Sequence, residues 1–270
     1  MHGKESFIDL VLFAEHPLPD VDRPRVSNTD FIDDLIVAGN LVNKILVKSV
    51  ALIPSISLEK LQQGILLGHM VRIYKLYDSF LLLISQNRTE MALLATRALT
   101  ETSITFAYLI QSLNNVICQK FIKASLAYDK KLFDFIQSKI KDGEPLPFEA
   151  KLIEDIKNTF AKTEYDIDDI NFGNDREWHA DLFSLSSKVG LSELYETLYR
   201  TCSRAEHGAW YYLEFFHLTE NESDYTPILE NTEPHPLLLI NTNLICLNAA
   251  LFYSEYIQPN NTQFPLLIKN

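Results

Sequence analysis

The stretch EMALLATRALTETSITFAYLI, residues 90–110, decides the fold class of this chain. Leucine, alanine, isoleucine and phenylalanine would cover most of the surface of a helix formed by these residues. A helix that is apolar on most sides must be buried by its neighbours, which predicts a central position in a helical bundle. Four polar residues nevertheless recur at helical spacing and form one stripe: Arg97, Glu101, Thr105 and Tyr108.

This polar stripe needs partners. Buried charges are costly unless they are paired, so the stripe is expected to face another helix or a wet cavity. Arg97 precedes Glu101 by four residues, which is the weaker order for a pair within one helix and favours partners elsewhere. Two interpretations stay open: a buried polar network that sets helix register, or the wall of a functional site.

The rest of the chain also shows helical periodicity. Apolar spacing and helix-end signals predict helices over about residues 30–53, 57–84, 89–113, 115–140, 145–162, 192–207 and 237–256. Ser57 and Ser192 are expected N-caps, and Pro236 suits a first helical turn. Residues 163–176 read as an acidic loop and residues 218–236 as polar and turn-rich.

The predicted fold class is all-α, a bundle of about six to eight helices, because no segment combines strict alternation with hairpin punctuation. Residues 1–28, punctuated by prolines, are expected to form an irregular arm. Residues 29–270 are predicted to form a single helical domain that ends with the helix near 237–256.

Composition and charge bear on three questions: nucleic-acid binding, the redox compartment and membrane insertion. The net charge of −12 argues against broad nucleic-acid binding, so DNA is not a predicted partner, but it permits a local basic cleft. Three widely spaced cysteines without a CxxC pair fit a reducing cytoplasm. The most apolar windows contain charged or asparagine residues, so no membrane span is predicted.

Neither a metal nor a cofactor is expected. His69, His179 and His217 lack the spacing of a metal-binding motif. The acidic residues after Tyr165 resemble a calcium loop only in part, since Ile170 holds a ligand position. The chain has no glycine-rich phosphate loop and no dinucleotide fingerprint.

The segment YETLYRTCSRAEHG, residues 195–208, is the strongest candidate for a functional site. Arg200 and His207 stand seven positions apart, which on a helix is two turns along nearly the same face. A permanent cation beside a group that titrates near neutral pH suits phosphodiester chemistry. Ser203 and Arg204 share this polar face, and Gly208 suits a helix end. The apolar or aromatic face is formed by Leu194, Tyr195, Leu198, Tyr199 and Cys202.

Taken together, the Arg97/Glu101 helix and this later segment resemble a family of uncharacterised prokaryotic helical proteins. That family is itself similar to the HEPN superfamily (higher eukaryotes and prokaryotes nucleotide-binding domains), whose signature is an arginine and a histidine with four to six residues between them. The resemblance covers about residues 35–215. Thr201 stands where members prefer Asn, Asp or His, and Ala209 stands where some members carry a tyrosine.

The resemblance implies a homodimer in which two such motifs face each other, and a metal-independent endoribonuclease of a defence or toxin-like system, as in phage defence. It implies that His207 is the acid/base group and that Arg200 stabilises phosphate charge. The supporting or binding residues would be Arg97, Glu101, Tyr199, Ser203 and Arg204.

Two alternatives remain open. The polar residues could form a non-catalytic module that binds a nucleotide or small anion, or they could serve packing in a helical protein-interaction module. Trp210, Tyr211 and Tyr212 could stack a base, although an aromatic run in a helical bundle more often belongs to the core.

Overall fold

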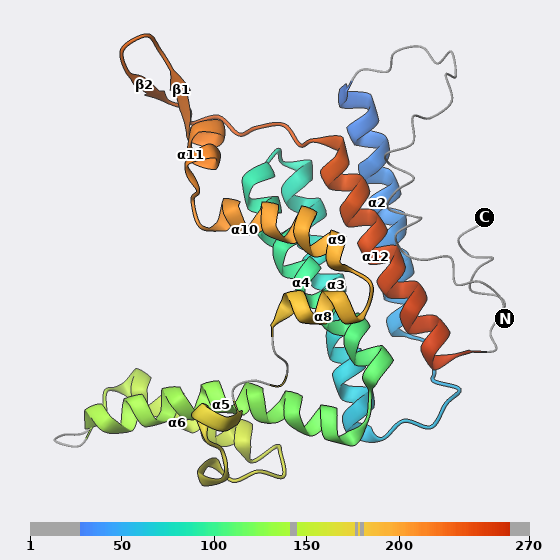
Figure 1. The fold of residues 1–270 in the computed structure, drawn as a ribbon, viewed down its shortest axis with the longest axis vertical. Coiled ribbons are helices and arrows are strands. Elements are labelled where there is room, and N and C mark those ends of the chain that lie inside the picture. The colour runs from blue at the N-terminus through green and yellow to red at the C-terminus, as the bar shows by residue number, and fades with distance from the viewer. Residues whose placement is uncertain (1–27, 141–144, 176–177, 179–180, 260–270) are drawn as a thin grey trace. The chain divides into compact units, whose positions relative to one another are not determined.

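The computed structural model describes residues 28–140, 145–175, 178 and 181–259 (Figure 1). The arm predicted for residues 1–28 therefore lies, apart from Asn28, outside the described residues. Over the described residues the chain is all-α with one small two-stranded sheet, which confirms the predicted fold class. Within the span predicted as one domain, the structure distinguishes two compact units.

The larger unit comprises the described residues up to 111 and from 181 onward. Its elements in chain order are α2 (Asn28–Val50), α3 (Lys60–Ser85), α4 (Thr89–Ser112), α8 (Leu182–Lys188), α9 (Ser192–Leu194), the π-helical turn η2 (Tyr195–Tyr199), α10 (Arg200–Glu206), α11 (Trp210–His217), β1 (Leu218–Glu220), β2 (Tyr225–Pro227) and α12 (Pro236–Ile257).

The helix α12 is the apolar centre of the larger unit and packs against α2 and α3. Its side chains Leu239, Cys246 and Ile257 are fully buried. Asn243 interrupts this apolar sequence, yet its Oδ1 lies 2.6 Å from the Tyr77 hydroxyl, which donates a hydrogen bond to it. Burying an amide with such a partner costs little free energy of folding, and the hydrogen bond fixes the alignment of α12 on α3.

By length and composition, α12 is the one helix among the described residues that could cross a membrane. However, 61% of its most apolar window is buried against the rest of the protein. A helix that fills the core of a soluble protein meets the same criteria of length and composition. The apolar character of α12 is thus accounted for by packing within the larger unit.

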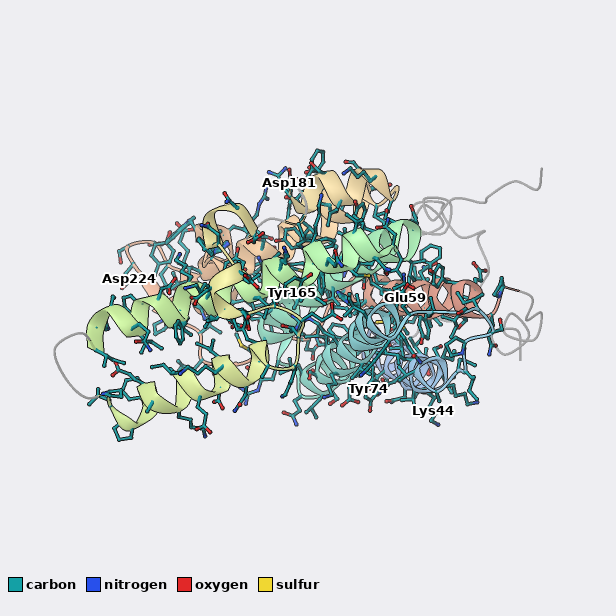
Figure 2. All side chains as sticks on the ribbon, turned by 90° about the horizontal axis from the view of Figure 1, so that it is seen from below. Lys44, Glu59, Tyr74, Tyr165, Asp181 and Asp224 are labelled. Atoms are coloured by element: carbon teal, nitrogen blue, oxygen red, sulfur yellow. The ribbon has the colours of Figure 1, made fainter. Side chains whose placement is uncertain are left out.

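The helices α2 and α3 approach each other closely at Gly39. A Cβ atom at this position would lie 2.6 Å from Leu81 Cδ2 and 2.9 Å from the Tyr77 hydroxyl oxygen. Glycine is therefore required by the helix contact rather than by the backbone conformation. Figure 2 shows the two helices with their side chains, with Lys44 labelled on α2 and Tyr74 on α3.

The long helices lie within a few residues of the predicted ranges, but the residues that cap two of them differ from the predicted ones. The second helix begins at Lys60, and Glu59 rather than Ser57 holds the N-cap position. The Gln62 side chain accepts a hydrogen bond from the Glu59 backbone N–H at 3.2 Å. This N–H is a donor at the helix start that no carbonyl within the helix can bond. Likewise Leu191 precedes α9, so that Ser192 is the first helical residue and not its cap.

The polar segment 218–236 contains a β-hairpin that the sequence analysis did not predict. Strands β1 and β2 pair antiparallel, with Glu220 opposite Tyr225. Each strand has only three residues, too few for an alternating pattern to be recognised.

The smaller unit comprises residues 112–180 and contains α5 (Asn115–Ile140), α6 (Pro147–Phe160), the 3₁₀ turn η1 (Ile167–Asp169) and α7 (Phe172–Asp175). Its core consists of Leu126, Ala127, Ile156, Phe160 and Ile170. The segment predicted as an acidic loop thus also supplies an apolar residue to this core.

Candidate functional site

The segment with the Arg200–His207 spacing is not one regular helix. After α9, the backbone forms the π-helical turn η2, in which the Arg200 N–H bonds the carbonyl of Tyr195, five residues earlier. Such a turn holds one residue more than an α-turn, which shifts the helix faces by about 100° between its two sides. Single π-turns inside α-helices are frequent at functional sites.

The apolar face predicted for this segment is confirmed. Leu194, Leu198 and Cys202 are buried against the rest of the larger unit. Burial raises the pKa of the Cys202 thiol to about 12, although the nearby Arg97 guanidinium opposes the shift. Cys202 is therefore a protonated core residue at neutral pH and not a nucleophile.

The helix α10 ends in a backbone motif that presents His207. The N–H of Ala209 bonds the Arg204 carbonyl at 3.1 Å, and the N–H of Gly208 bonds the Ala205 carbonyl at 3.2 Å. This pair of bonds is a Schellman motif, which requires a left-handed residue after the helix. Gly208 fills that position with φ +58°, so its predicted place at a helix end is confirmed. The His207 side chain is 73% exposed.

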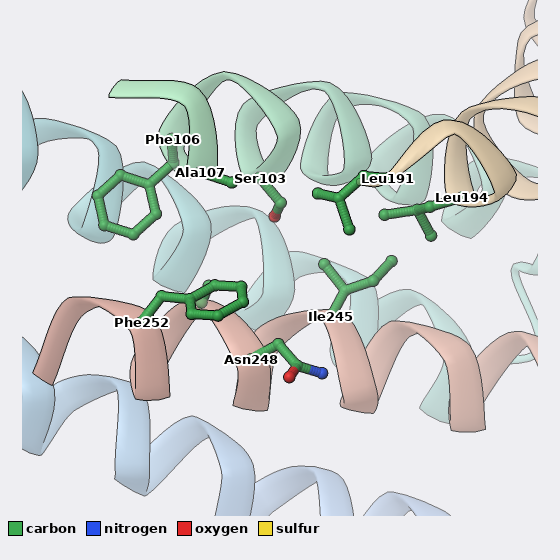
Figure 3. A pocket seen from close by; sticks show the side chains of 9 residues that line it. Ser103, Phe106, Ala107, Leu191, Leu194, Ile245, Asn248 and Phe252 are labelled. Carbon is green, nitrogen blue, oxygen red and sulfur yellow. The ribbon is translucent and has the colours of Figure 1, made fainter. Parts of the chain in front are cut away.

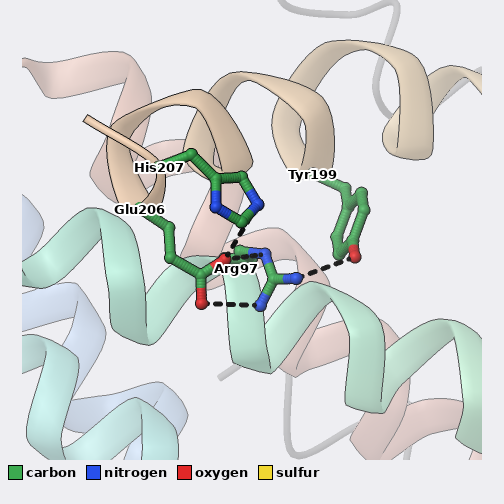
Figure 4. A network of polar contacts seen from close by, with 4 residues as sticks. All are labelled: Arg97, Tyr199, Glu206 and His207. Atoms are coloured by element: carbon green, nitrogen blue, oxygen red, sulfur yellow. Dashed lines mark hydrogen bonds and ion pairs between the residues drawn. The ribbon is translucent and has the colours of Figure 1, made fainter. Parts of the chain in front are cut away.

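Arg97 reaches from α4 to the end of α10 (Figure 4). Its Nε lies 2.8 Å from Glu206 Oε2, and one of its terminal nitrogens donates to Glu206 Oε1 at 3.2 Å. The other terminal nitrogen donates to the Tyr199 hydroxyl at 3.1 Å. The guanidinium thus meets the Glu206 carboxylate at two points, in an ion pair that contains one hydrogen bond.

His207 joins this cluster through the same carboxylate, because its Nε2 lies 3.8 Å from Glu206 Oε2. Glu206 therefore stands between a permanent cation and an imidazole, as Figure 4 shows. We call Arg97, Tyr199, Glu206 and His207 the Arg97 cluster. The side chains of Arg97 and Glu206 are 23% and 38% exposed, so the cluster lies at the protein surface.

Tyr199 is held on both sides. Arg97 lies over its ring, 5.1 Å from the centroid, and Tyr195 stacks on it at 5.0 Å. Burial raises the pKa of the Tyr199 hydroxyl, and the nearby Glu101 carboxylate raises it further. Tyr199 is consequently a neutral hydroxyl at physiological pH, and Phe183 extends the stack beyond Tyr195 at 5.5 Å.

Arg200 does not join the cluster. Its guanidinium pairs with Glu196 at 2.7 Å, one turn earlier, and the two side chains are 53% and 46% exposed. Among the described residues, no hydrogen bond or ion pair connects Arg200 with Arg97 or His207. The structure thus brings His207, Arg97 and Tyr199 together, while Arg200 lies on the solvent-facing side.

The other predicted supporting residues are placed around the cluster. Glu101 is exposed and lies close enough to Tyr199 to affect its pKa. Ser203 is half-buried and Arg204 is exposed.

Glu206 is the residue that the sequence analysis missed. Tyr199 belongs to the predicted apolar or aromatic face, and Glu206 stands seven positions later, two turns along the same face. That spacing indicates on which face Glu206 lies, but it does not identify Arg97 as its partner.

A cavity elsewhere in the larger unit does not compete with the cluster as a site. It lies between α4, Leu191, α9 and α12 and is lined mainly by apolar side chains, including Phe106, Leu194 and Ile245 (Figure 3). Its volume of about 10 Å³ leaves room for one water molecule at most. A nucleotide would therefore bind at the surface rather than in this cavity.

Within the part of the chain that the structure describes, no group of three or more histidine, cysteine, aspartate or glutamate side chains could hold a metal ion. Cys118, Cys202 and Cys246 are buried.

A family model matches residues 63–225, which is more than half of the chain. Its description is "Family of unknown function (DUF5677)". The chain belongs to this family. No curated protein and no solved structure matches the chain significantly.

The region shared with DUF5677 contains both halves of the Arg97 cluster, from α4 and from α10. It also contains the hairpin strand β1, whereas α2 and α12 lie outside it. The family assignment thus covers the candidate site but names no activity for it.

Proposed function

We propose that this DUF5677 member is related to the HEPN superfamily and acts as a metal-independent endoribonuclease in a cytoplasmic defence or toxin-like system, with His207 as its acid/base group. The observation that carries the proposal is the exposed His207 imidazole beside the Arg97–Glu206 ion pair. A polymer can reach such a surface site, whereas an enclosed pocket would admit only a small ligand.

In the proposed reaction, His207 removes the proton from a ribose 2′-OH. The 2′-oxygen then bonds to the adjacent phosphorus, and the bond from phosphorus to the 5′-oxygen breaks. The departing 5′-oxygen takes up a proton, which leaves a 2′,3′-cyclic phosphate and a 5′-OH. His207 is suited to this proton transfer because its imidazole is exposed and can both accept and donate a proton.

The proposed roles of the arginines differ. Arg200 and Arg204 are exposed, and an exposed pair such as Arg200–Glu196 is weak enough to open when a phosphate binds. Arg97 is already neutralised by Glu206, so its role would be to position that carboxylate beside His207. In a homodimer, His207 and Arg200 of a second copy would complete the site.

The products give a direct test. Wild-type protein in EDTA should cleave single-stranded RNA and leave 2′,3′-cyclic phosphate ends, detected by mass spectrometry. The same oligonucleotide with a 2′-deoxy sugar at the cleaved position should remain intact. Cleavage of the deoxy substrate at the same rate would contradict attack by the 2′-oxygen.

A second candidate function is binding of a nucleotide or small anion without catalysis. The Arg97–Glu206 pair favours it, because removing the carboxylate's charge would leave an arginine ready for an anion. Glu206→Gln should then increase stabilisation of the protein by pyrophosphate in thermal melting, and Arg97→Ala should abolish it. If pyrophosphate stabilises neither the wild-type nor the Glu206→Gln protein and no RNA is cleaved, the cluster serves packing alone.

A further inference from the structure

The helix α11 and the following hairpin expose large apolar side chains. Trp210 is 57% exposed, Tyr211 64%, Phe215 52% and Tyr225 44%. We call these four residues the aromatic face. Exposed aromatic clusters of this kind mark surfaces that bind other molecules.

The aromatic face is presented by an anchored helix. On the opposite side of α11, Tyr212 and Phe216 are buried, and the Tyr212 hydroxyl donates to the Thr201 carbonyl at 3.0 Å. At the end of α11, His217 Nε2 lies 3.0 Å from Glu90 Oε1 on α4. The exposed rings therefore belong to a helix whose orientation is fixed by its other face.

The rings of the aromatic face pack against one another in two pairs. Trp210 and Tyr225 pack edge to face at 5.8 Å, which ties the hairpin to α11. Tyr211 and Phe215 are stacked at 6.1 Å along the helix. A preformed set of rings loses little conformational entropy when a partner binds.

The segment that carries the aromatic face is acidic. From residue 205 to residue 267 the sequence contains no lysine and no arginine, although Arg204 of α10 lies close enough to Tyr212 to oppose the rise in the pKa of its hydroxyl. Partial burial raises the pKa of the Tyr225 hydroxyl, and the nearby carboxylates of Glu220 and Glu214 raise it further. Further acidic residues follow in the hairpin and after it: Glu222, Asp224, Glu230 and Glu233.

We infer that the aromatic face is a docking site for a lysine- or arginine-rich segment of a partner protein. Cations bind the faces of tryptophan and tyrosine rings, and the negatively charged carboxylates nearby attract the same cations. The apolar rings bury the stems of these long side chains. A stacked RNA base is disfavoured here, because the same carboxylates repel its phosphates.

The test uses isothermal titration calorimetry with three probes: a synthetic peptide rich in arginine, lysine and leucine, the same peptide with glutamate at each basic position, and a single-stranded RNA. The basic peptide should bind saturably and the acidic peptide should not bind. Any binding of the RNA, which the proposed function assigns to the His207 site, should be the same for the wild-type and Trp210→Ala proteins. Trp210→Ala should weaken its binding about tenfold. Glu214→Lys combined with Glu220→Lys should have at least as large an effect.

Two control variants separate this site from general attraction to an acidic protein. Phe148→Ala removes an exposed aromatic residue of α6, and Asp155→Asn removes an exposed carboxylate there. Both should leave binding unchanged. Absence of peptide binding, equal binding by the Trp210→Ala protein, or RNA binding that depends on Trp210 would each overturn the inference.

Discussion

Arg97 is held by Tyr199 of η2 and Glu206 of α10, and this arrangement defines the candidate site. The guanidinium meets Glu206 at two points and Tyr199 at a third. Solvent screens a partly buried ion pair less than an exposed one, so the partly buried pair keeps more of its electrostatic free energy. The chain offers its own comparison, since Arg200 and Glu196 form an exposed pair within one helix.

A double-mutant cycle measures this difference. For Arg97→Ala and Glu206→Ala, the coupling free energy should be about 1 kcal/mol. For Arg200→Ala and Glu196→Ala it should be about 0.3 kcal/mol, as for other exposed pairs on one helix. Urea denaturation of the single and double variants provides both values, and equal couplings would show that the Arg97 pair has no special role.

His69 makes stability depend on pH. Burial lowers the pKa of its imidazole, with a smaller opposing effect of its hydrogen bond to the Ile65 carbonyl and a lowering by Arg72. The folded state thus binds a proton less readily than the unfolded state, whose histidine titrates near about pH 6.5. The contribution of His69 to stability is complete above that pH and is lost as the pH falls.

The free energy of unfolding should therefore decline on acidification below about pH 6.5. The His69→Gln protein should show a smaller decline, measured by urea denaturation at several pH values. Identical pH profiles for the two proteins would contradict this role of His69.

At the scale of elements, the end of α10 positions His207 through Gly208. A left-handed conformation costs a residue with a Cβ atom about 1 kcal/mol, so Gly208→Ala should destabilise the protein by about that amount. Gly68→Ala is the matched control, because Gly68 lies inside α3 with open space around its Cβ position. This substitution should stabilise the protein by about 0.5 to 1 kcal/mol, and the two signs are checked by thermal unfolding.

The long elements could be predicted from the sequence because each carries its own signals. Periodic apolar residues and terminal prolines or glycines located α4, α5 and α12 to within a few residues. The π-turn η2 could not be predicted, since a helical pattern assumes one constant period. Arg200 and His207 both follow this turn, and the structure pairs Arg200 with Glu196, four residues earlier, and not with the Arg97 cluster.

At the scale of the whole molecule, charge limits how RNA can bind. The net charge is −12, and the exposed arginines near His207 are Arg200 and Arg204. Each phosphate neutralised on a single strand contributes about −0.7 to the slope of log K against log salt concentration. Two contacts therefore predict a slope of about −1.4.

Fluorescence anisotropy with labelled RNA and the His207→Ala protein measures that slope without cleavage. A slope steeper than about −4 would indicate more phosphate contacts than Arg200 and Arg204 can make. Arg204→Ala should reduce the slope by about half.

The arrangement of the site depended on contacts between distant parts of the chain. Arg97 and Glu206 are separated by 109 positions, and spacing within either helix cannot reveal such a pair. The sequence did show that Arg97 needs a partner on another element, because Arg97 preceding Glu101 is the weaker order for a pair within one helix. Three-dimensional packing was required to identify Glu206 as that partner.

The most direct test of the central claim compares RNA cleavage in EDTA by the wild-type and His207→Ala proteins at equal concentration. His235→Asn is the control, because asparagine can keep the capping acceptor that His235 provides for α12. Wild type and His235→Asn should cleave, while His207→Ala should lose at least about a hundredfold in rate with an unchanged melting temperature. Undiminished cleavage by His207→Ala would contradict the proposed role of His207.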